Sequence, residues 1–388
     1  MIRLQYGWVV VAAAFTLMFL GFGAAYSFAA FFKAFQAEFQ ASRGHVALVF
    51  SLGAFLWFAV GAPAGMFADR YGVRRVALAG VFCLTAALGL AAAARSLAAL
   101  YLTYSIGLGL GVGLSYVPAV GAVQPWFGAN RAFASGIAVA GIGAGNFLVP
   151  PLAAWWIELL GWRGAFVALA ALTLALGGTA AAAISNAPAA RAGAAPAAGA
   201  TLREALASSG FWLLYLALLL PMFGCFMPMV HLGPYAQDLG HSEAAAVTLV
   251  SLIGLGSLLG RFTVGALADR AGRLPSLAGT YAGLGLMLLL WWAAASYWVL
   301  ALFALAFGVL YGGFVALLPS IVMDRFGARN VAGIIGCLYT AAGIGTLLGP
   351  PLAGAAFDAF GSYDVPILGG AALSFAGAAS LAPLLRGR

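Results

Sequence analysis

The sequence predicts an all-α membrane protein in which twelve transmembrane helices form two pseudo-symmetric six-helix bundles. Three observations support this fold class: the composition, the count of apolar stretches, and an internal repeat. The chain of 388 residues is 64% hydrophobic and 7% charged, whereas a soluble domain carries about 25% charged residues. A soluble core cannot hide this much apolar side chain. The composition therefore excludes soluble enzymes, nucleic-acid-binding domains and disulfide frameworks.

The apolar stretches are each long enough to cross a bilayer as a helix, which takes about 20 residues. They are rich in Leu, Ala and Gly and too long for the strands of a membrane barrel. The first stretch is longer than the apolar core of a signal peptide, so we expect an uncleaved first helix. In chain order the predicted spans are 7–35, 46–68, 76–94, 98–126, 133–157, 163–185, 210–236, 245–268, 275–295, 297–323, 331–356 and 363–385.

The longest segment between spans divides the chain into two halves. Residues 186–209 are rich in Ala, Pro and Gly, which predicts a flexible cytoplasmic linker with a short interfacial helix over 201–207. The predicted organisation is a six-helix bundle over 1–185, the linker over 186–209, and a second six-helix bundle over 210–388.

The basic residues predict the orientation of these spans. With a cytoplasmic N-terminus, 13 basic residues fall on the cytoplasmic side and four on the opposite side, as the positive-inside rule requires. The net charge of +8 then reflects membrane topology and not a nucleic-acid site. Both termini are expected in the cytoplasm.

An internal repeat indicates duplicated halves. GMFADRYG at 65–72 recurs as GALADRAG at 265–272, and GNFLVPPLA at 145–153 recurs as GTLLGPPLA at 345–353. Both motifs share an offset of 200 residues. Parallel repeats of this kind place a binding site near the membrane midplane, between the halves, where rocking exposes it to each side in turn.

The repeated motif carries a family resemblance. GMFADRYGVRR at 65–75 resembles the loop signature between helices 2 and 3 of the major facilitator superfamily. Five further motifs resemble the bacterial branch of the monocarboxylate transporter family, which is related to the oxalate/formate antiporters. They are YGW at 6–8, SR at 42–43, GLGVGLSYVP at 109–118, GWRGAF at 161–166 and VHLGPYAQD at 230–238. The resemblance spans the whole chain and implies a transporter.

Arg261 is the strongest candidate for binding a substrate. It lies eight residues before Asp269, which puts it roughly 12 Å inside its span, where an arginine costs at least ~2.5–3.5 kcal/mol. It must therefore face a cavity or a partner, and a planar guanidinium suits a carboxylate. The alternative is pairing with a protein acid or with carbonyl groups. The resemblance implies that Arg261 is the arginine that binds the substrate carboxylate.

Two departures from the family narrow the substrate. Ser257 stands one helical turn before Arg261, where animal members carry an aspartate. Ala342 follows Tyr339-Thr340-Ala341, where the oxalate/formate antiporters carry a lysine. A site with a single cation can neutralise one carboxylate. It would leave the second carboxylate of an oxalate dianion without a counter-charge. A lactate- or pyruvate-like monocarboxylate is therefore expected.

Other polar side chains inside the spans are expected to shape the pocket. The hydroxyls of Tyr116, Tyr311 and Tyr339 suit a 2-hydroxy or 2-oxo group, although tyrosine also occupies lipid-facing positions. Ser257 and Asn146 are further candidates, since an unpaired amide in lipid is costly. Asn146 alternatively contacts a neighbouring helix.

His231 and Asp238 are the candidates for proton coupling. They lie two helical turns apart near the outer end of the seventh span, and histidine titrates in the useful range. They resemble the outer proton pathway of the family. A packed histidine and a solvated loop acid are the alternatives, and the substrate carboxylate could carry the proton instead. Lys33 is expected to be an interfacial, snorkelling cation.

The repeated loop motif is expected to form the inner gate. Carboxylates there can cap a facing helix or pair with a loop arginine, and its glycines allow close helix approach. The alternative is that these charges only determine topology. The gating candidates are Gly65, Asp69, Arg70, Arg131, Asp269 and Arg270, with Gly265 equivalent to Gly65.

These features predict a secondary active transporter of a small monocarboxylate, working by proton-coupled symport and alternating access. An anion antiporter of the oxalate/formate type and a non-transporting carboxylate sensor are the alternatives. An enzyme is not expected, because no span carries a clustered nucleophile, paired carboxylates or a metal-ligand set. The expected partners are the monocarboxylate, a proton and the bilayer of a bacterial-type inner membrane. No cofactor, metal or nucleic acid is expected, and the monomer should suffice.

Overall fold

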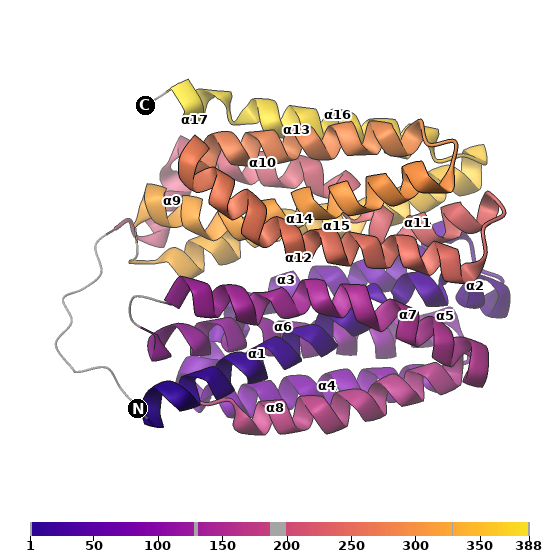
Figure 1. Cartoon of the computed structure of the whole chain (residues 1–388), viewed down its shortest axis with the longest axis horizontal. Coiled ribbons are helices and arrows are strands. Elements are labelled where there is room, and N and C mark those ends of the chain that lie inside the picture. The colour runs from indigo at the N-terminus through magenta and orange to yellow at the C-terminus, as the bar shows by residue number, and fades with distance from the viewer. Residues whose placement is uncertain (1, 128–130, 187–198, 328, 387–388) are drawn as a thin grey trace.

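The computed structural model describes residues 2–127, 131–186, 199–327 and 329–386. Within these ranges the regular structure is helical, apart from a single bridge between Gly199 and Gly327. Figure 1 shows the helices running side by side along the long axis of the molecule. Eleven helical segments of the described chain are long and apolar enough to cross a membrane.

The first half of the described chain supplies the helices before residue 187. They are α1 (Ile2–Tyr26), α2 (Phe28–Phe39), α3 (Arg43–Tyr71), α4 (Val73–Ala92), α5 (Leu97–Leu100), η1 (Tyr101–Ser105), α6 (Ile106–Val123), η2 (Gln124–Trp126), α7 (Arg131–Leu172), η3 (Thr173–Gly177) and α8 (Gly178–Ala183).

The second half supplies the helices after residue 198. They are α9 (Leu202–Ala207), α10 (Ser209–Cys225), α11 (Met227–Asp238), α12 (Glu243–Ala271), α13 (Arg273–Trp292), α14 (Tyr297–Phe326), α15 (Val331–Phe360), α16 (Asp364–Ser380) and α17 (Ala382–Arg386).

Eleven segments correspond to the twelve predicted spans because two spans follow each other without a loop. The segment Phe133–Ala183 has 51 residues, and its backbone leaves helical geometry at Gly161, with φ 69° and ψ 168°. This break falls between the predicted spans 133–157 and 163–185. The predicted twelve-helix fold is confirmed.

The internal repeat extends to the backbone geometry. Gly72 and Gly272 end α3 and α12 with φ of 88° and 92°, and Gly161 and Gly361 have φ of 69° and 71°. Each pair is 200 residues apart, and positive φ favours glycine because it has no Cβ. Both halves therefore place a glycine with positive φ at equivalent points, and Gly72 and Gly272 also agree in ψ, at 141° and 140°.

Two predicted spans are bent, which hydropathy did not indicate. The first breaks between α1 and α2 at Ser27, whose hydroxyl donates to the Ala24 carbonyl over 2.8 Å. The seventh breaks between α10 and α11 at Phe226. The bends stand at nearly equivalent places in the repeat and turn α2 and α11 toward each other, where they are in contact.

The two halves pack through helix pairs that cross between them. α3 contacts α15, and α7 contacts α12, so that the two colour ranges of Figure 1 meet along one central plane. A Cβ added to Gly143 on α7 would come within 2.8 Å of the Leu258 backbone on α12. Backbones at this distance leave no room for a side chain, so the halves touch directly there.

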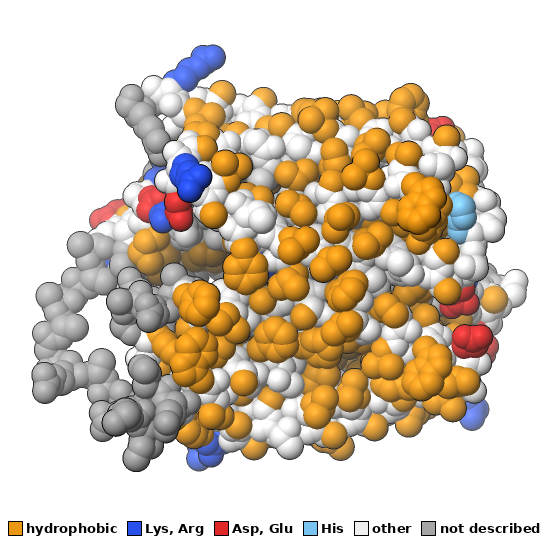
Figure 2. All heavy atoms as spheres, in the orientation of Figure 1, with side chains coloured by type: hydrophobic (Ala, Val, Ile, Leu, Met, Phe, Trp, Pro, Cys, Tyr) orange, Lys and Arg blue, Asp and Glu red, His pale blue; other side chains and the backbone are white. Residues whose placement is uncertain are grey.

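The two ends of the bundle differ in the elements that they carry. α1 begins and α17 ends at one end, which we call the terminal end (Figure 1). The connections α2–α3, α11–α12 and α15–α16 lie at the opposite end, which we call the far end. Figure 2 shows charged side chains at both ends and apolar ones over the surface between them. Exposed side chains such as Phe82, Leu102 and Trp298 are typical of a lipid-facing belt.

Only part of the predicted linker is described, because residues 187–198 lie outside the described ranges. The predicted short helix is present as α9, with Thr201 and Glu204 forming a reciprocal capping box. The hydrogen bonds from Thr201 hold the pKa of Glu204 below its ordinary value. The N–H of Ala200 donates to the Phe326 carbonyl over 2.7 Å, so this end of the linker is attached to α14.

Candidate functional site

A small cavity of about 50 Å³ lies between the two halves. Since one water molecule needs about 10–15 Å³ by this measure, the cavity holds a compact molecule of a few non-hydrogen atoms. α1, α3, α6 and α7 line it from one half and α10, α12, α14 and α15 from the other. The lining residues are Phe22, Tyr26, Trp57, Phe58, Tyr116, Ile142, Leu218, Met222, Phe226, Arg261, Tyr311, Phe314, Val315, Leu318, Tyr339 and Ala342.

Arg261 is the single charged residue in this lining. It is 9% exposed, and none of its Nε, Nη1 and Nη2 atoms has a hydrogen-bond partner among the described residues. A buried charge without a partner is costly. The cavity lining therefore presents an anion with a fork of N–H donors that no described residue uses.

Tyrosine hydroxyls supply most of the remaining polarity. Tyr116, Tyr311 and Tyr339, predicted from the sequence, all line the cavity. Tyr26 was not predicted. Its hydroxyl lies 2.8 Å from the hydroxyl of Tyr311, which links α1 to α14. One of these two hydroxyls donates to the other, so the acceptor's own proton is left to serve an occupant.

Ser257 and Asn146 lie outside this lining. Ser257 is buried on α12, one turn from Arg261, and its hydroxyl has no partner in the described part of the chain. The Asn146 amide nitrogen lies 3.9 Å from the sulfur of Met229, across the contact between the halves. The substrate contact expected for both side chains stays a prediction.

A larger hollow of about 640 Å³ opens at the terminal end of the second half. Its charged lining is exposed, and Arg273 pairs there with Asp324 over 2.7 Å. It lies within one half and contains no buried charge. The central cavity is thus the better candidate site.

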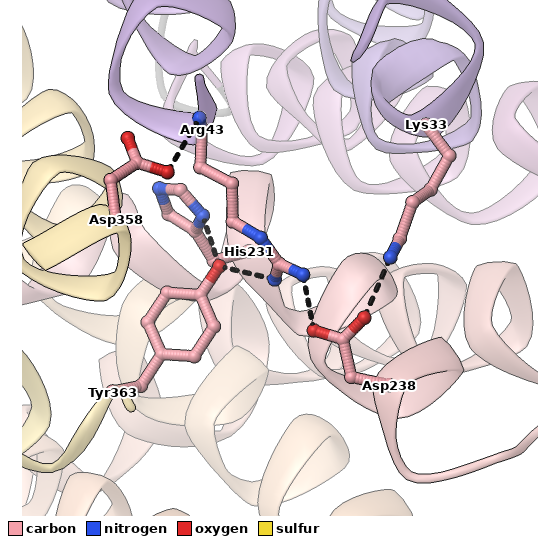
Figure 3. A network of polar contacts seen from close by, with 6 residues as sticks. All are labelled: Lys33, Arg43, His231, Asp238, Asp358 and Tyr363. Carbon is pink, nitrogen blue, oxygen red and sulfur yellow. Dashed lines mark hydrogen bonds and ion pairs between the residues drawn. The ribbon is translucent and has the colours of Figure 1, made fainter. Parts of the chain in front are cut away.

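The far end holds a polar network that joins the halves, which we call the far-end cluster: Lys33, Arg43, His231, Asp238, Asp358 and Tyr363 (Figure 3). The Asp238 carboxylate accepts from Lys33 Nζ at 2.6 Å and from Arg43 Nη2 at 2.5 Å. Both cations come from the first half and Asp238 from the second. Lys33, which the sequence predicts to be an interfacial cation, thus also pairs with an acid of the other half.

Arg43 is the centre of this network. It is 7% exposed, donates to the Tyr363 hydroxyl over 2.9 Å, and lies 3.8 Å from the centre of the Phe357 ring. Asp358 accepts from the backbone N–H groups of Arg43 and Gly44, each over 3.0 Å. A carboxylate of the second half thus caps the first turn of α3.

His231 joins the same network from α11. Its Nε2 lies 2.8 Å from the Pro350 carbonyl, which can only accept, so Nε2 carries the proton. Its Nδ1 lies 2.9 Å from the Tyr363 hydroxyl. His231 and Asp238, the two predicted proton-coupling residues, are therefore connected through Tyr363 and Arg43. Sequence reasoning missed both connectors as partners, although it noted the Ser42-Arg43 motif.

The predicted gating residues lie at the terminal end. Arg70, Asp269 and Arg270 are exposed, while the side chains of Asp69 and Arg131 lie outside what the structure describes. Asp269 pairs with Arg273 of its own half at 4.0 Å. Among the described side chains, no ion pair joins the halves at this end.

The expected close helix approach at Gly65 and Gly265 is not seen. A Cβ at Gly265 would meet nothing within 4 Å, and one at Gly65 would meet a Val117 methyl at an ordinary 3.6 Å. The close approaches lie farther along α7 and α12 instead.

The fold is that of a membrane transporter built from two repeated halves with a cavity between them. The model of the Major Facilitator Superfamily matches residues 13–282 and 222–388, and the chain belongs to this superfamily. Within it, the chain belongs to the monocarboxylate transporter family, as similarity to curated members shows.

Three relatives illustrate this similarity. Monocarboxylate transporter 13 of Rattus norvegicus is 30% identical over 98% of this chain and 89% of its own length. Monocarboxylate transporter 11 of Mus musculus is 31% identical over 94% and 84%. Monocarboxylate transporter 3 of Rattus norvegicus is 30% identical over 93% and 76%.

A solved structure shares the fold. A bacterial homologue of the human lysosomal transporter Spinster, in an inward-facing and unoccupied conformation, superposes with a TM-score of 0.72 at 17% identity. The match covers 97% of this chain and 95% of that one.

Proposed function

We propose that this protein is a secondary active transporter of a small monocarboxylate of the lactate or pyruvate type. The observation that carries the proposal is Arg261, a buried guanidinium without a partner in a cavity between the halves. The names of the relatives, all monocarboxylate transporters, support it. In this proposal the substrate carboxylate is the partner that Arg261 lacks.

The cavity suits one carboxylate and a short carbon chain. Arg261 binds both carboxylate oxygens through its fork of donors, while Tyr116, Tyr311 and Tyr339 line the cavity around the bound acid. The aromatic walls exclude water, which strengthens the charge contact. A dianion would leave one carboxylate without a cation, because Arg261 is the only charged group in the lining.

Alternating access follows from the difference between the ends. The far-end cluster closes one entrance by joining the halves, whereas the terminal end has no described ion pair between them. With the positive-inside orientation, the terminal end and both termini are cytoplasmic. In the state that is open at the far end, the repeated loop motif forms the inner gate at the terminal end. The residues that form this gate are Asp69, Arg70, Arg131, Asp269 and Arg270.

Proton coupling is placed at the far-end cluster. Asp238 is the carboxylate that pairs with both Lys33 and Arg43 among the described side chains, so its protonation removes a charge that holds the halves together. His231 connects this change to Pro350 on α15 through Tyr363. Proton binding from outside thereby shifts the population toward states that are open at the far end.

The proposal also states the membrane in which the protein lies and its oligomeric state. The chain is a multi-pass protein of the cell membrane and works as a monomer, since both sides of the cavity come from one chain. Its superfamily and its relatives, which are monocarboxylate transporters, support a transporter and not an enzyme.

The test is uptake of radiolabelled pyruvate and L-lactate into liposomes that contain the purified protein, with protein-free liposomes as the control. An inward proton gradient should drive accumulation without any anion trapped inside, and a protonophore should abolish it. Uptake that requires a trapped carboxylate would establish the antiporter instead. Saturable binding without flux would establish a sensor.

A further inference from the structure

The central cavity contains a second buried donor that has no partner. Trp57 lines the cavity from α3 and is 3% exposed. Its indole Nε1 has no acceptor among the described residues. A buried N–H left unsatisfied is costly and rare. Trp57 and Arg261 are thus two residues of one lining whose N–H donors have no partner among the described residues.

The indole ring is held in place by its neighbours. Its centroid lies 5.6 Å from Phe22, 5.8 Å from Phe50 and 6.4 Å from Tyr26, all in edge-to-face geometry. Phe58 packs on it at 5.9 Å. Rings packed on several sides restrict rotation, so the N–H cannot turn away to find an acceptor elsewhere.

The two unpartnered residues are linked by a short chain of contacts. Trp57 packs on Tyr26, and the Tyr26 hydroxyl bonds to Tyr311, which lines the cavity together with Arg261. The cavity measures only about 50 Å³. A molecule that reaches Arg261 in so small a space has its remaining atoms beside the aromatic wall that contains Trp57.

The chemistry of the indole group restricts what it can bind. An indole N–H donates and cannot accept. With the carboxylate on Arg261, Trp57 needs an oxygen on the adjacent carbon, which a 2-oxo or 2-hydroxy acid supplies. A 2-methyl group of the same size leaves the N–H unsatisfied, and sites built to bond an oxygen discriminate strongly against such analogues.

We propose that Trp57 donates a hydrogen bond to the C2 oxygen of the substrate and thereby selects 2-oxo and 2-hydroxy monocarboxylates over acids without that oxygen. This inference rests on the proposed function, because it requires that Arg261 binds the carboxylate. The inference adds Trp57 to the candidate substrate-binding residues, although nothing in the sequence alone indicates this role.

The test measures binding of pyruvate, L-lactate and isobutyrate to the purified protein by calorimetry. Isobutyrate replaces the lactate hydroxyl by a methyl group of similar size. The wild type should bind L-lactate and pyruvate about tenfold or more tighter than isobutyrate. Trp57→Phe keeps an aromatic ring at this position and removes the indole N–H, so the ratio of the L-lactate and pyruvate affinities to the isobutyrate affinity should fall toward one.

Trp291→Phe is the matched control. The Trp291 Nε1 is also buried without a partner, the side chain is 0% exposed, and it is not part of the cavity lining. This variant should keep the wild-type preference. A loss of preference in Trp291→Phe equal to that in Trp57→Phe would assign the effect to general packing and overturn the proposal.

If Trp57→Phe does not fold, the wild-type affinities for L-lactate and isobutyrate still test the role of Trp57. Equal wild-type affinity for L-lactate and isobutyrate would overturn the role of Trp57 and leave monocarboxylate transport intact. A preference that persists in folded Trp57→Phe would do the same. Failure of the wild type to bind or take up any of the three acids would instead overturn the proposed function.

Discussion

Two buried arginines occupy the contact between the halves, and their surroundings are opposite. Arg43 is 7% exposed and Arg261 is 9% exposed. Arg43 has a carboxylate, a hydroxyl and an aromatic ring around it, whereas all three nitrogens of Arg261 are without a partner among the described residues. Buried charges need compensation. The other half of the chain compensates Arg43, and we propose that a bound substrate compensates Arg261.

This difference separates the roles of the two regions. The far-end cluster is a closed set of contacts, and breaking it should change stability and conformation. In the central cavity, Arg261 has no partner among the described residues. Changing the residues of this cavity should therefore affect binding more than stability. The following variants are ordered from the largest expected effect to the smallest.

Arg261→Ala should lower uptake of labelled pyruvate by at least about hundredfold, because two charge-assisted hydrogen bonds are lost. Its melting temperature in detergent, without substrate, should equal or exceed that of the wild type, because an unpaired buried charge is removed. Arg261→Lys, which keeps the charge but not the fork, is the matched variant and should stay strongly impaired. Uptake near the wild-type level in Arg261→Ala would remove the basis of the proposed site.

Arg43→Ala should destabilise the protein by on the order of 1–3 kcal/mol, since several buried contacts between the halves are lost. It should also open the far end. Spin labels at Ala37 on α2 and Ala244 on α12, in a variant without native cysteines, should report longer distances by double electron–electron resonance. Arg163→Ala is the control, because the exposed Arg163–Glu38 pair lies within the first half. An unchanged distance distribution in Arg43→Ala would refute the closing role.

Tyr363→Phe should destabilise by about 1 kcal/mol, less than Arg43→Ala. The ring beside Arg43 remains, while the hydrogen bonds with Arg43 and His231 are lost. A thermal double-mutant cycle of Arg43→Ala and Tyr363→Phe should show coupling, and the cycle of Arg163→Ala and Tyr363→Phe should show none. Additive effects in the first cycle would argue against a connected network.

Lys33→Met should have the smallest effect, below about 1 kcal/mol, although Lys33 shares Asp238 with Arg43. The Lys33 and Asp238 side chains are 38% and 30% exposed, so water screens this pair. Its contribution to the melting temperature should vanish in high salt, whereas that of Arg43 should persist. An equal loss for Lys33→Met and Arg43→Ala would show that burial does not distinguish the two pairs.

The sequence was sufficient for the fold because apolar length and a repeat at a single offset are properties of the chain itself. The bends at Ser27 and Phe226 were missed because they leave hydropathy unchanged. In the central cavity, the sequence pointed to Arg261 and three tyrosines, since polar groups are conspicuous inside apolar spans. Tyr26 and Trp57 escaped notice because an aromatic residue in such a span equally suits a lipid-facing position.

The contacts of the far-end cluster were beyond the reach of one sequence. Arg43 and Asp358 are 315 residues apart, and nothing in the local pattern around either residue indicates that they meet. The same holds for Lys33 and Asp238. Which charge pairs with which depends on how the two halves are packed, and this is a property of the folded chain.

The positive φ of Gly161 and Gly361 restricts the chirality of the residue that can stand at these two turns. A Cβ at either position would meet nothing within 4 Å, yet φ is 69° and 71°. The space would admit a methyl group, but the backbone conformation disfavours it on an L-residue. A D-alanine placed there by chemical synthesis would suit the turn that L-alanine strains. The pairs of spans that meet at these turns thus depend on the one amino acid that is neither left- nor right-handed.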